Sequence, residues 1–519
     1  MEQSLRIGLF DAGMTHLHRV GLAGLYMTLK RFEENNVSFD NASWTLSPQK
    51  VELAWSESAS DFLEALFGAS FGINKDGLID FAAHRGHAIG DLERISLSEA
   101  VRMTFLQHNK QNMIPKGTPS KQRNFDFGDK TVTVSYKPFV KPYAHMEASK
   151  LLVTKTGKLR ARSAIKGWLC LGAAKRHSSL AATQIEETPR GLVCLLYAPV
   201  ACLYYRLYHR AQDGGFDARR GTAIVLPYIH DLESYARCYG RYLQTPVEHL
   251  SADGLGDAGL SALVALRAGD ALEQLGITGC TVTTMGTVTW SSQQKTRTAV
   301  ANMEDIDDKR LDLFDHAWRC IPNRKVVREG KPTKKDPNPE NTYFIATSLS
   351  RGLIADNIAA GENWYEGFTR LMQSKELGKR VSYERGGLMK MVKETAWDHE
   401  TDRKLVAAVH AAIRNRYGML ASRAKQRGEQ PRFDREFERM RTGLMRAKNA
   451  QTLRAELADL FARGGLNKTL QESWAEILPL FTGPDWQRAR DLALLALASY
   501  AGRGAEQIET GVEDEGQEG

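Results

Sequence analysis

Few residues of this chain have the types and spacing that catalysis requires. His16 and His18 stand at the start of an expected helix, where a spacing of two places them on different faces, so polar packing is favoured over metal binding. Residues 254–259 match G-x-G-x-x-G, but no strand is expected before them, so no pyrophosphate site is predicted. The carboxylates at 305–308 are followed at once by two cations, which is typical of an exposed helix start.

The cysteines also give no pattern of chemistry. Six of them are scattered along the chain without a C-x-x-C pair, which argues against a disulfide framework or a structural zinc site. No run of 18 apolar residues occurs, and the first residues lack a signal-peptide layout. We therefore expect reduced thiols, a cytoplasmic location, no metal and no cofactor.

Clustered positive charge is the strongest chemical signal. The formal net charge is +8, and residues 105–175 hold fourteen Lys and Arg residues against three Asp and Glu residues. Residues 319–335 hold seven against one, and residues 403–448 hold thirteen against four. A phosphate backbone selects such clusters because each neutralised phosphate releases counterions. The alternative is that these cations lie on solvated helix faces and loops.

The first basic block predicts a nucleic-acid-binding loop at 109–124, followed by a strand and a turn at 155–158. Aromatic residues from Phe125 to Tyr143 are interleaved with its cations and could stack on bases, although each one could equally be the core side of a strand. Amide and cationic side chains can read base edges. The candidates for such reading are Lys116, Lys121, Gln122, Arg123, Asn124, Gln293, Gln294 and Lys295.

Other cations are better suited to contacts with the nucleic-acid backbone. Residues 324–339 are polar, basic and interrupted by three prolines, so an exposed loop is predicted there. The candidates for backbone contact are Lys155, Lys158, Arg160, Arg162, Arg324, Lys325, Arg328, Lys331, Lys334 and Lys335.

The elements that must position these residues change in character along the chain. Residues 1–320 mix strand and helix signals, and a helix from Thr15 to about Glu34 carries Gly21 and Gly24, which indicates close packing of another backbone. Residues 321–388 form a basic loop and a connecting helix capped by Ser348 or Ser350. Residues 389–505 read as a bundle of five helical segments, and residues 506–519 as a disordered acidic tail. The predicted fold class is α+β, a mixed body followed by an all-α bundle.

Two strings resemble a known family. Leu9–Leu29 (LFDAGMTHLHRVGLAGLYMTL) and Ser350–Phe368 (SRGLIADNIAAGENWYEGF) are similar to the large subunits of type I CRISPR surveillance complexes (Cascade), of the myxobacterial-type branch. The resemblance implies a non-catalytic subunit that reads the protospacer-adjacent motif, aids duplex opening, stabilises the R-loop and recruits a downstream effector.

The same resemblance implies the partners. They would be guide RNA and target DNA, a backbone repeat subunit, a foot subunit, small helical subunits, and a helicase-nuclease or transposition module. On this basis basic residues of the bundle would contact the displaced strand: Arg414, Arg423, Lys425, Arg427, Arg435 and Arg439.

Two alternatives stay open. One is a metal-dependent nuclease whose site combines His84, His87 and the cluster at Asp305, and the other is a stand-alone nucleic-acid-binding protein. A further hypothesis concerns Met389 and Met391, since the glycines just before them could encode a ribosome-binding sequence. A start there would produce a separate small subunit containing the bundle.

Overall fold

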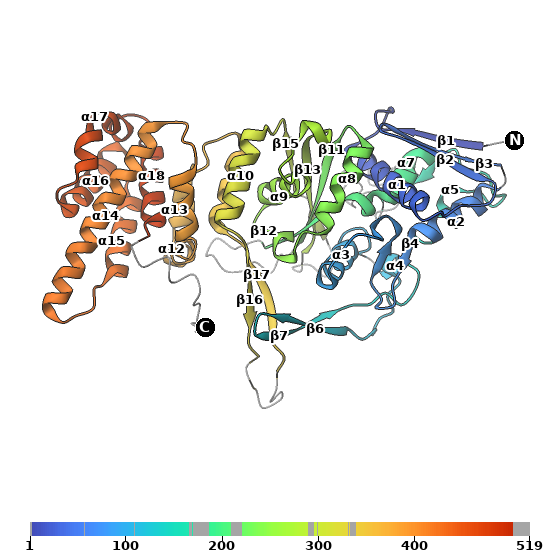
Figure 1. The fold of residues 1–519 in the computed structure, drawn as a ribbon, viewed down its shortest axis with the longest axis horizontal. Coiled ribbons are helices and arrows are strands. Elements are labelled where there is room, and N and C mark those ends of the chain that lie inside the picture. Colours follow the sequence, from blue (N-terminus) through green and yellow to red (C-terminus); the bar gives the residue numbers. More distant parts are fainter. Residues whose placement is uncertain are drawn as a thin grey trace. The chain divides into compact units, whose positions relative to one another are not determined.

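The computed structural model describes residues 3–56, 58–107, 109–165, 169, 186–208, 221–288, 295–297, 299–330, 332 and 339–501. The chain divides into two compact units (Figure 1). Among described residues, the first contains residues 3–208, 221–311 and 323–347, and the second contains residues 312–322 and 348–501. No described helix is both long and apolar enough to cross a membrane.

Two sheets organise the first unit. A three-stranded antiparallel sheet has the order β1 (Gln3–Gly8), β3 (Lys50–Trp55), β2 (Ala42–Ser47). A larger sheet runs from β12 (Ser251–Ala252) through β10 (Leu203–Leu207), β11 (Gly221–Ile229) and β13 (Ile277–Val288) to β14 (Lys295–Arg297), and β15 (Val300–Glu304) also pairs with β13. The β10–β12 pair is parallel, so this sheet is mixed.

Helix α1 (His16–Glu34) packs along α7 (Pro189–Ala201) in the core of the first unit. The predicted cap is confirmed, because the Thr15 side chain accepts from the His18 backbone N–H. A Cβ placed on Gly24 would lie 2.3 Å from the Tyr197 carbonyl oxygen, so the predicted close approach of a second backbone is also confirmed. The helices α8 (Leu232–Leu243) and α9 (Leu255–Arg267) pack against each other nearby.

Smaller elements complete the first unit and connect its layers. They are α2 (Ala59–Ser70), β4 (Phe71–Ile73), β5 (Ile79–Phe81), η1 (Ala82–His84), α3 (Asp91–Met103), α4 (Asn109–Asn112), α5 (Ser149–Leu152), β8 (Ser163–Ala164), β9 (Glu186–Glu187), η2 (Val247–Leu250) and η3 (Glu273–Leu275).

Two hairpins of the first unit stand apart from these sheets. They are formed by β6 (Lys121–Phe127) with β7 (Lys130–Tyr136) and by β16 (Arg324–Arg328) with β17 (Thr342–Ala346). Figure 1 shows the second hairpin crossing the end of the first, and β7 contacts β17. We call these four strands the paired hairpins.

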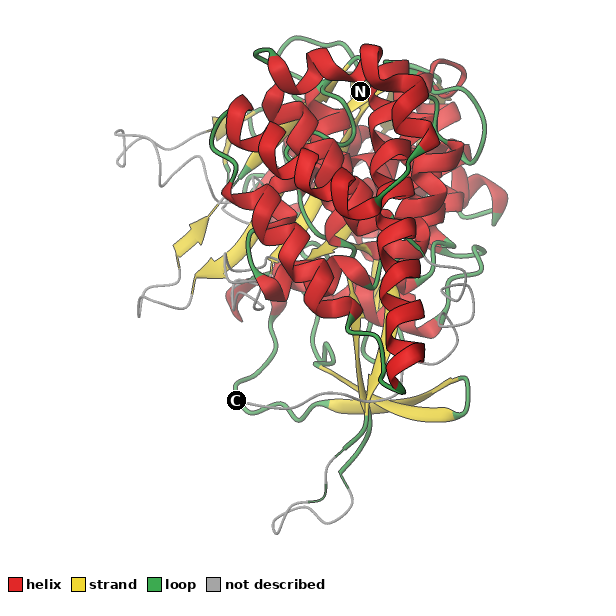
Figure 2. Cartoon of the chain, turned by 90° about the vertical axis from the view of Figure 1, so that its left-hand side faces the viewer, coloured by secondary structure: helices red, strands yellow, loops and turns green. Residues whose placement is uncertain are grey.

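The described part of the second unit is helical (Figure 2). Helix α10 (Asp308–Cys320) enters it from the first unit, and α11 (Leu349–Ala360), η4 (Phe368–Met372), α12 (Lys375–Ser382) and α13 (Arg385–Glu394) follow. The five predicted segments are present as α14 (Glu400–Arg427), α15 (Phe433–Arg446), α16 (Ala450–Gly464), α17 (Lys468–Thr482) and α18 (Trp486–Ser499). Helix α18 is buried along most of its length and packs against α14. The α+β class with a C-terminal run of helices is confirmed.

Candidate nucleic-acid interface

The paired hairpins bring two of the basic blocks together. The backbone N–H of Thr133 donates to the carbonyl oxygen of Asn341 (3.0 Å), and the Asn341 amide donates to the carbonyl of Thr131 (3.1 Å). Lys130 forms an ion pair with Glu329 at 2.7 Å. These contacts join residues about two hundred positions apart, so one surface carries side chains from both blocks.

Both segments were expected to be loops, and that expectation is wrong in part. Lys121–Asn124 belong to β6, and Arg324–Arg328 form β16. The turn-favouring polar residues of the first segment pair with the clear strand TVTVSY, which supplies the alternation that β6 lacks. In the second segment Val326 and Val327 pair with Phe344 and Tyr343.

The predicted motif-reading residues have different surroundings. Lys116 is exposed on the loop before β6 and has no ion pair with any described residue. Gln122 donates to Glu340 (3.1 Å), and Arg123 forms an ion pair with Asp91. To read bases, these two side chains would first have to leave their internal partners.

The other candidates give weaker support for a contact with bases. Lys121 donates to the Asp76 carbonyl (3.1 Å), and Asn124 accepts from the Thr133 hydroxyl (3.0 Å). Lys295 belongs to β14. Gln293 and Gln294 lie outside the described residues. Lys116 is therefore the described candidate with the least internal engagement.

The interleaved aromatic residues are largely structural. Tyr136, Phe139 and Tyr143 are buried, and Phe125 packs partly against a cluster that includes Tyr136. Phe127 and Tyr343 meet edge to face with their ring centroids 5.1 Å apart, which ties the hairpins together. The alternative that these rings form the core side of strands is correct for Tyr136, whereas Phe139 and Tyr143 are buried in the segment that follows β7.

The cations assigned to backbone contact divide into two groups. In the first, Gly157 has a φ of +79° in a tight turn where the Thr154 N–H donates to the Lys158 carbonyl (2.8 Å), so the predicted turn is present. That turn and the residues after it expose Lys155, Lys158, Arg160 and Arg162.

The second group lies on β16. Lys325 is 3.0 Å from Glu248 and lies over the ring of Phe127, and Arg328 lies over the ring of Phe344. Arg324 is exposed on the same strand. Lys331, Lys334 and Lys335 lie outside the described residues.

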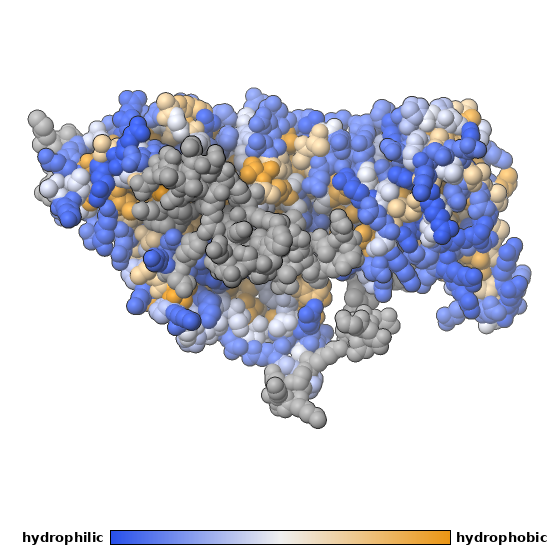
Figure 3. Space-filling view, turned by 180° about the vertical axis from the view of Figure 1, so that it is seen from behind, coloured by the Kyte–Doolittle hydropathy of each residue, from blue (hydrophilic) through white to orange (hydrophobic). Residues whose placement is uncertain are grey.

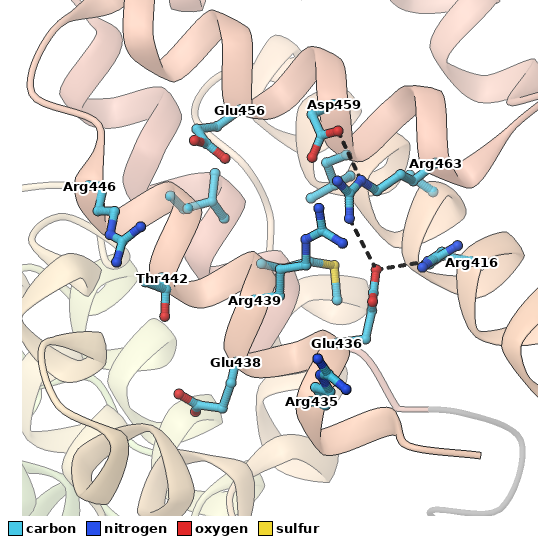
Figure 4. A pocket seen from close by; sticks show the side chains of 15 residues that line it. Arg416, Arg435, Glu436, Glu438, Arg439, Thr442, Arg446, Glu456, Asp459 and Arg463 are labelled. Carbon is cyan, nitrogen blue, oxygen red and sulfur yellow. Dashed lines mark hydrogen bonds and ion pairs between the residues drawn. The ribbon is translucent and has the colours of Figure 1, made fainter.

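In the second unit all six predicted bundle cations are exposed, and Figure 3 shows a largely hydrophilic surface over these helices on its right-hand side. Arg435 and Arg439 line a groove of about 520 Å³ between α14, α15 and α16 (Figure 4). Arg446 lines this groove too, although the sequence prediction omitted it. It lies seven positions after Arg439, a spacing of two helical turns that places both side chains on the same face of a helix. Glu436 neutralises part of the groove by accepting from Arg416 (2.8 Å). Among described residues, no carboxylate pairs with Arg435, Arg439 or Arg446.

Comparison with known proteins identifies the family. Residues 6–196 match the DevT N-terminal domain and residues 393–519 match the DevT C-terminal domain. The chain is 30% identical over 544 aligned positions to the CRISPR-associated protein Cas8a1/Csx13 of Myxococcus xanthus (strain DK1622), covering 98% of this chain and 91% of that protein. The chain belongs to the Cas8a1/Csx13 family. The resemblance to type I CRISPR large subunits is confirmed.

The second family-like string of this Cas8a1/Csx13 member is a packing motif. Arg351 is fully buried, and its guanidinium donates to the Ile321 carbonyl (3.3 Å). The Asn357 amide donates to the carbonyls of Trp364 (3.1 Å) and Glu366 (2.8 Å). Hydrogen-bonded buried polar groups of this kind favour one local structure.

The first string has a structural role as well. His18 is buried beside Glu187 (3.5 Å), and desolvation lowers its pKa. His16 stacks on Tyr228 with ring centroids 3.9 Å apart. The two histidines have separate partners, in agreement with the polar interpretation.

The residues of the nuclease alternative are not arranged as one site. His84 is buried, its ring nitrogen bonds to the Val200 carbonyl (2.8 Å), and desolvation lowers its pKa to about 4. Within the described chain, the one group of three potential metal ligands includes neither His84, His87 nor Asp305. Contrary to expectation, a short strand, β12, precedes the G-x-G-x-x-G segment. The last glycine of that segment, Gly259, packs tightly against the Met303 side chain, so it serves packing in the core.

Four of the described cysteines do not belong to the group of three potential metal ligands, and their thiols are poor nucleophiles. Cys194, Cys202, Cys238 and Cys280 are buried, and desolvation raises the pKa of each one. A thiolate is the reactive form of cysteine, so these four residues are suited to packing.

Proposed function

We propose that this type I CRISPR large subunit is a non-catalytic reader that recognises a short motif in duplex DNA, aids opening of the duplex and stabilises the displaced strand. It would act in a complex with guide RNA and other Cas subunits and recruit a downstream nuclease or transposition module. Base pairing with the guide would supply sequence fidelity, so the protein needs few base contacts of its own.

The observation that carries this proposal is the presence of exposed, unpaired cations in both units. Lys116, Lys155 and Lys158 in the first unit have no ion pair with a described residue, and the same holds for Arg435 and Arg439 in the second. Cations without internal partners can neutralise phosphates without losing a salt bridge. Their presence in both units is consistent with contacts to more than one part of a nucleic acid.

Motif reading is assigned to Lys116, with Arg123 able to join it after leaving Asp91. A lysine or arginine can donate to the guanine edge in the major groove. A base contact and a phosphate contact differ in one measurable way. Loss of a base contact relaxes preference at one position, whereas loss of a phosphate contact weakens all sequences alike.

The test uses the complex assembled with guide RNA and a library of duplexes that vary in the motif. Lys116→Ala should reduce discrimination at one motif position by about tenfold, equivalent to about 1.4 kcal/mol. Lys150→Ala is the matched control, since Lys150 is exposed but pairs with Glu147 (3.0 Å). An unchanged motif preference in Lys116→Ala would remove the assignment of this residue.

The wider proposal has its own test. A purified chain that cleaves DNA when Mg²⁺ or Mn²⁺ is added, and loses that activity in His84→Ala, would favour the nuclease alternative. A chain that is stable alone and binds DNA equally well without guide RNA and Cas subunits would favour the stand-alone alternative.

A further inference from the structure

Three potential metal ligands from two helices of the second unit converge beside one another. His316 and Cys320 stand four positions apart on α10 and so share one face of that helix, and Glu394 is the last residue of α13. The Cys320 Sγ lies 3.6 Å from the His316 Nε2, and the Glu394 Oε2 lies 3.7 Å from the same nitrogen. All three ligand atoms lie within 4.8 Å of one another.

These separations fit a tetrahedral metal centre. With Zn–N near 2.0 Å and Zn–S near 2.3 Å, a tetrahedral angle places the nitrogen and sulfur about 3.5 Å apart, and a carboxylate oxygen about 3.4 Å from that nitrogen. The first separation is close to the 3.6 Å observed. The second requires a shift of a few tenths of an ångström by Glu394, whose side chain is 58% exposed and therefore has room to move.

The arrangement differs from that of a Cys-His-Glu catalytic triad. In a triad the nucleophile contacts one ring nitrogen of the histidine, and the carboxylate orients the ring through the other nitrogen. Here the carboxylate lies 3.7 Å from Nε2, and the sulfur lies beside the ring, 3.6 Å from Nε2 and 4.0 Å from Nδ1. The donors of a ligand set are therefore gathered at one place, and a rotation of the His316 or Cys320 side chain is needed to bring the sulfur in front of Nε2.

The packing of α13 against α10 positions His316 and Cys320, whereas the Glu394 side chain is exposed. A Cβ placed on Gly387 would lie 2.1 Å from the Cys320 carbonyl oxygen, so α13 packs directly against the end of α10. Cys320 is half-buried, whereas the four other described cysteines are buried.

We propose that His316, Cys320 and Glu394 bind one borderline-soft divalent transition-metal cation, with Zn²⁺ as the first candidate and water in the fourth position. On binding, the thiol loses its proton to solvent and the thiolate sulfur coordinates the cation. The bound ion joins the end of α10 to the end of α13. Sequence patterns did not reveal this site, because Glu394 lies 74 positions after Cys320 and no C-x-x-C pair is present.

The test uses the full-length, untagged chain with Zn²⁺ and Co²⁺ as probes. Equilibrium dialysis against zinc should give one tightly bound ion per chain, and cobalt should produce the thiolate-to-cobalt charge-transfer absorption of a cysteine ligand. Cys320→Ser and His316→Gln should abolish that absorption and weaken zinc binding by more than about tenfold. Glu394→Gln should weaken binding while keeping the absorption.

Matched controls separate this site from other thiols and from misfolding. Cys170→Ser removes the cysteine that lies outside the described residues, and it should keep both the stoichiometry and the absorption. Zinc should raise the Tm of the wild-type chain and leave that of Cys320→Ser unchanged, while the metal-free Tm values should agree. Absence of the cobalt absorption in the wild type, or its persistence in Cys320→Ser, would overturn the proposal.

Discussion

A Cβ placed on Gly21 of α1 would lie 1.8 Å from the carbonyl oxygen of Cys194 on α7. No side chain fits in that space, so the two helices pack backbone against backbone at this point. Gly21→Ala should destabilise the protein by about 3 kcal/mol or more, because the helices must separate and lose their buried contacts. Urea unfolding monitored by circular dichroism measures the change.

Gly68 provides the matched control for this substitution. It is an exposed glycine inside α2, and a Cβ there would meet nothing within 4 Å. Gly68→Ala should stabilise the helix by about 0.5–1 kcal/mol through the higher helix propensity of alanine. Equal effects of the two substitutions would contradict the assigned cause.

Asp402 of α14 is fully buried and holds the family-like string in place. It accepts hydrogen bonds from Arg488 of α18 (Nε, 3.0 Å) and from the Tyr365 hydroxyl. Asp402→Asn keeps the shape but removes the charge that pairs with Arg488, so a loss of about 3 kcal/mol is expected. The change in unfolding midpoint of the chain measures it.

Two positions earlier on α14, Glu400 also pairs with an arginine, Arg403, but both side chains are exposed. Glu400→Gln should therefore lower the unfolding midpoint far less than Asp402→Asn does, because solvent screens an exposed pair. A loss for Glu400→Gln as large as that for Asp402→Asn would show that burial does not decide the strength of these pairs.

His410 makes the second unit sensitive to acid. Its ring nitrogen bonds to the Ser499 hydroxyl (3.0 Å), and desolvation lowers its pKa to about 4 from an ordinary 6.5. The folded chain therefore binds fewer protons here than the unfolded chain between these values. Above pH 6.5 this histidine does not reduce the free energy of unfolding. As the pH drops below 6.5, the free energy of unfolding falls by about 1.4 kcal/mol per pH unit until the folded pKa is reached.

His410→Gln removes this titration while keeping a hydrogen-bonding side chain. Between pH 7 and pH 5 the variant should lose about 2 kcal/mol less stability than the wild type. His399→Gln, which changes an exposed histidine just before α14, should leave the pH difference unchanged. Identical pH profiles for wild type and His410→Gln would exclude His410 as the source.

Local sequence signals predicted the helices well. Thr15, the periodic leucines and two tolerated glycines predicted α1 and its close neighbour, and glycines and prolines marked the ends of α14, α16 and α17. These features depend on residues within a few positions of one another, where capping and amphipathic patterns act.

Features made by distant residues were missed. Arg123 lies opposite Asp91, and β16 becomes a strand only through β17, which follows a long basic segment. Val326 and Val327 favour a strand, but the charged residues and prolines around them do not, and pairing with β17 supplies the stabilisation. The predicted domain bounds and nucleic-acid contacts, and the proposed start at Met389 or Met391, stay predictions. Met391 itself is buried within α13.

The groove arginines give a prediction that can be tested on single-stranded DNA. Arg435 and Arg439 stand four positions apart on α15, are exposed and have no ion pair with a described residue. Each phosphate contact to a single strand adds about 0.7 to the slope of log affinity against log salt. The double variant Arg435→Ala, Arg439→Ala should therefore lower that slope by about 1.4 and weaken binding at low salt.

Arg403→Ala is the control for this experiment, because Arg403 is equally exposed but already pairs with Glu400. It should change the salt slope by much less than the double variant. Fluorescence anisotropy of a labelled, unstructured oligonucleotide at several salt concentrations gives both slopes. Equal slopes for wild type and double variant would mean that the groove does not contact phosphates, and the displaced strand would then have to be assigned to the other exposed cations of α14.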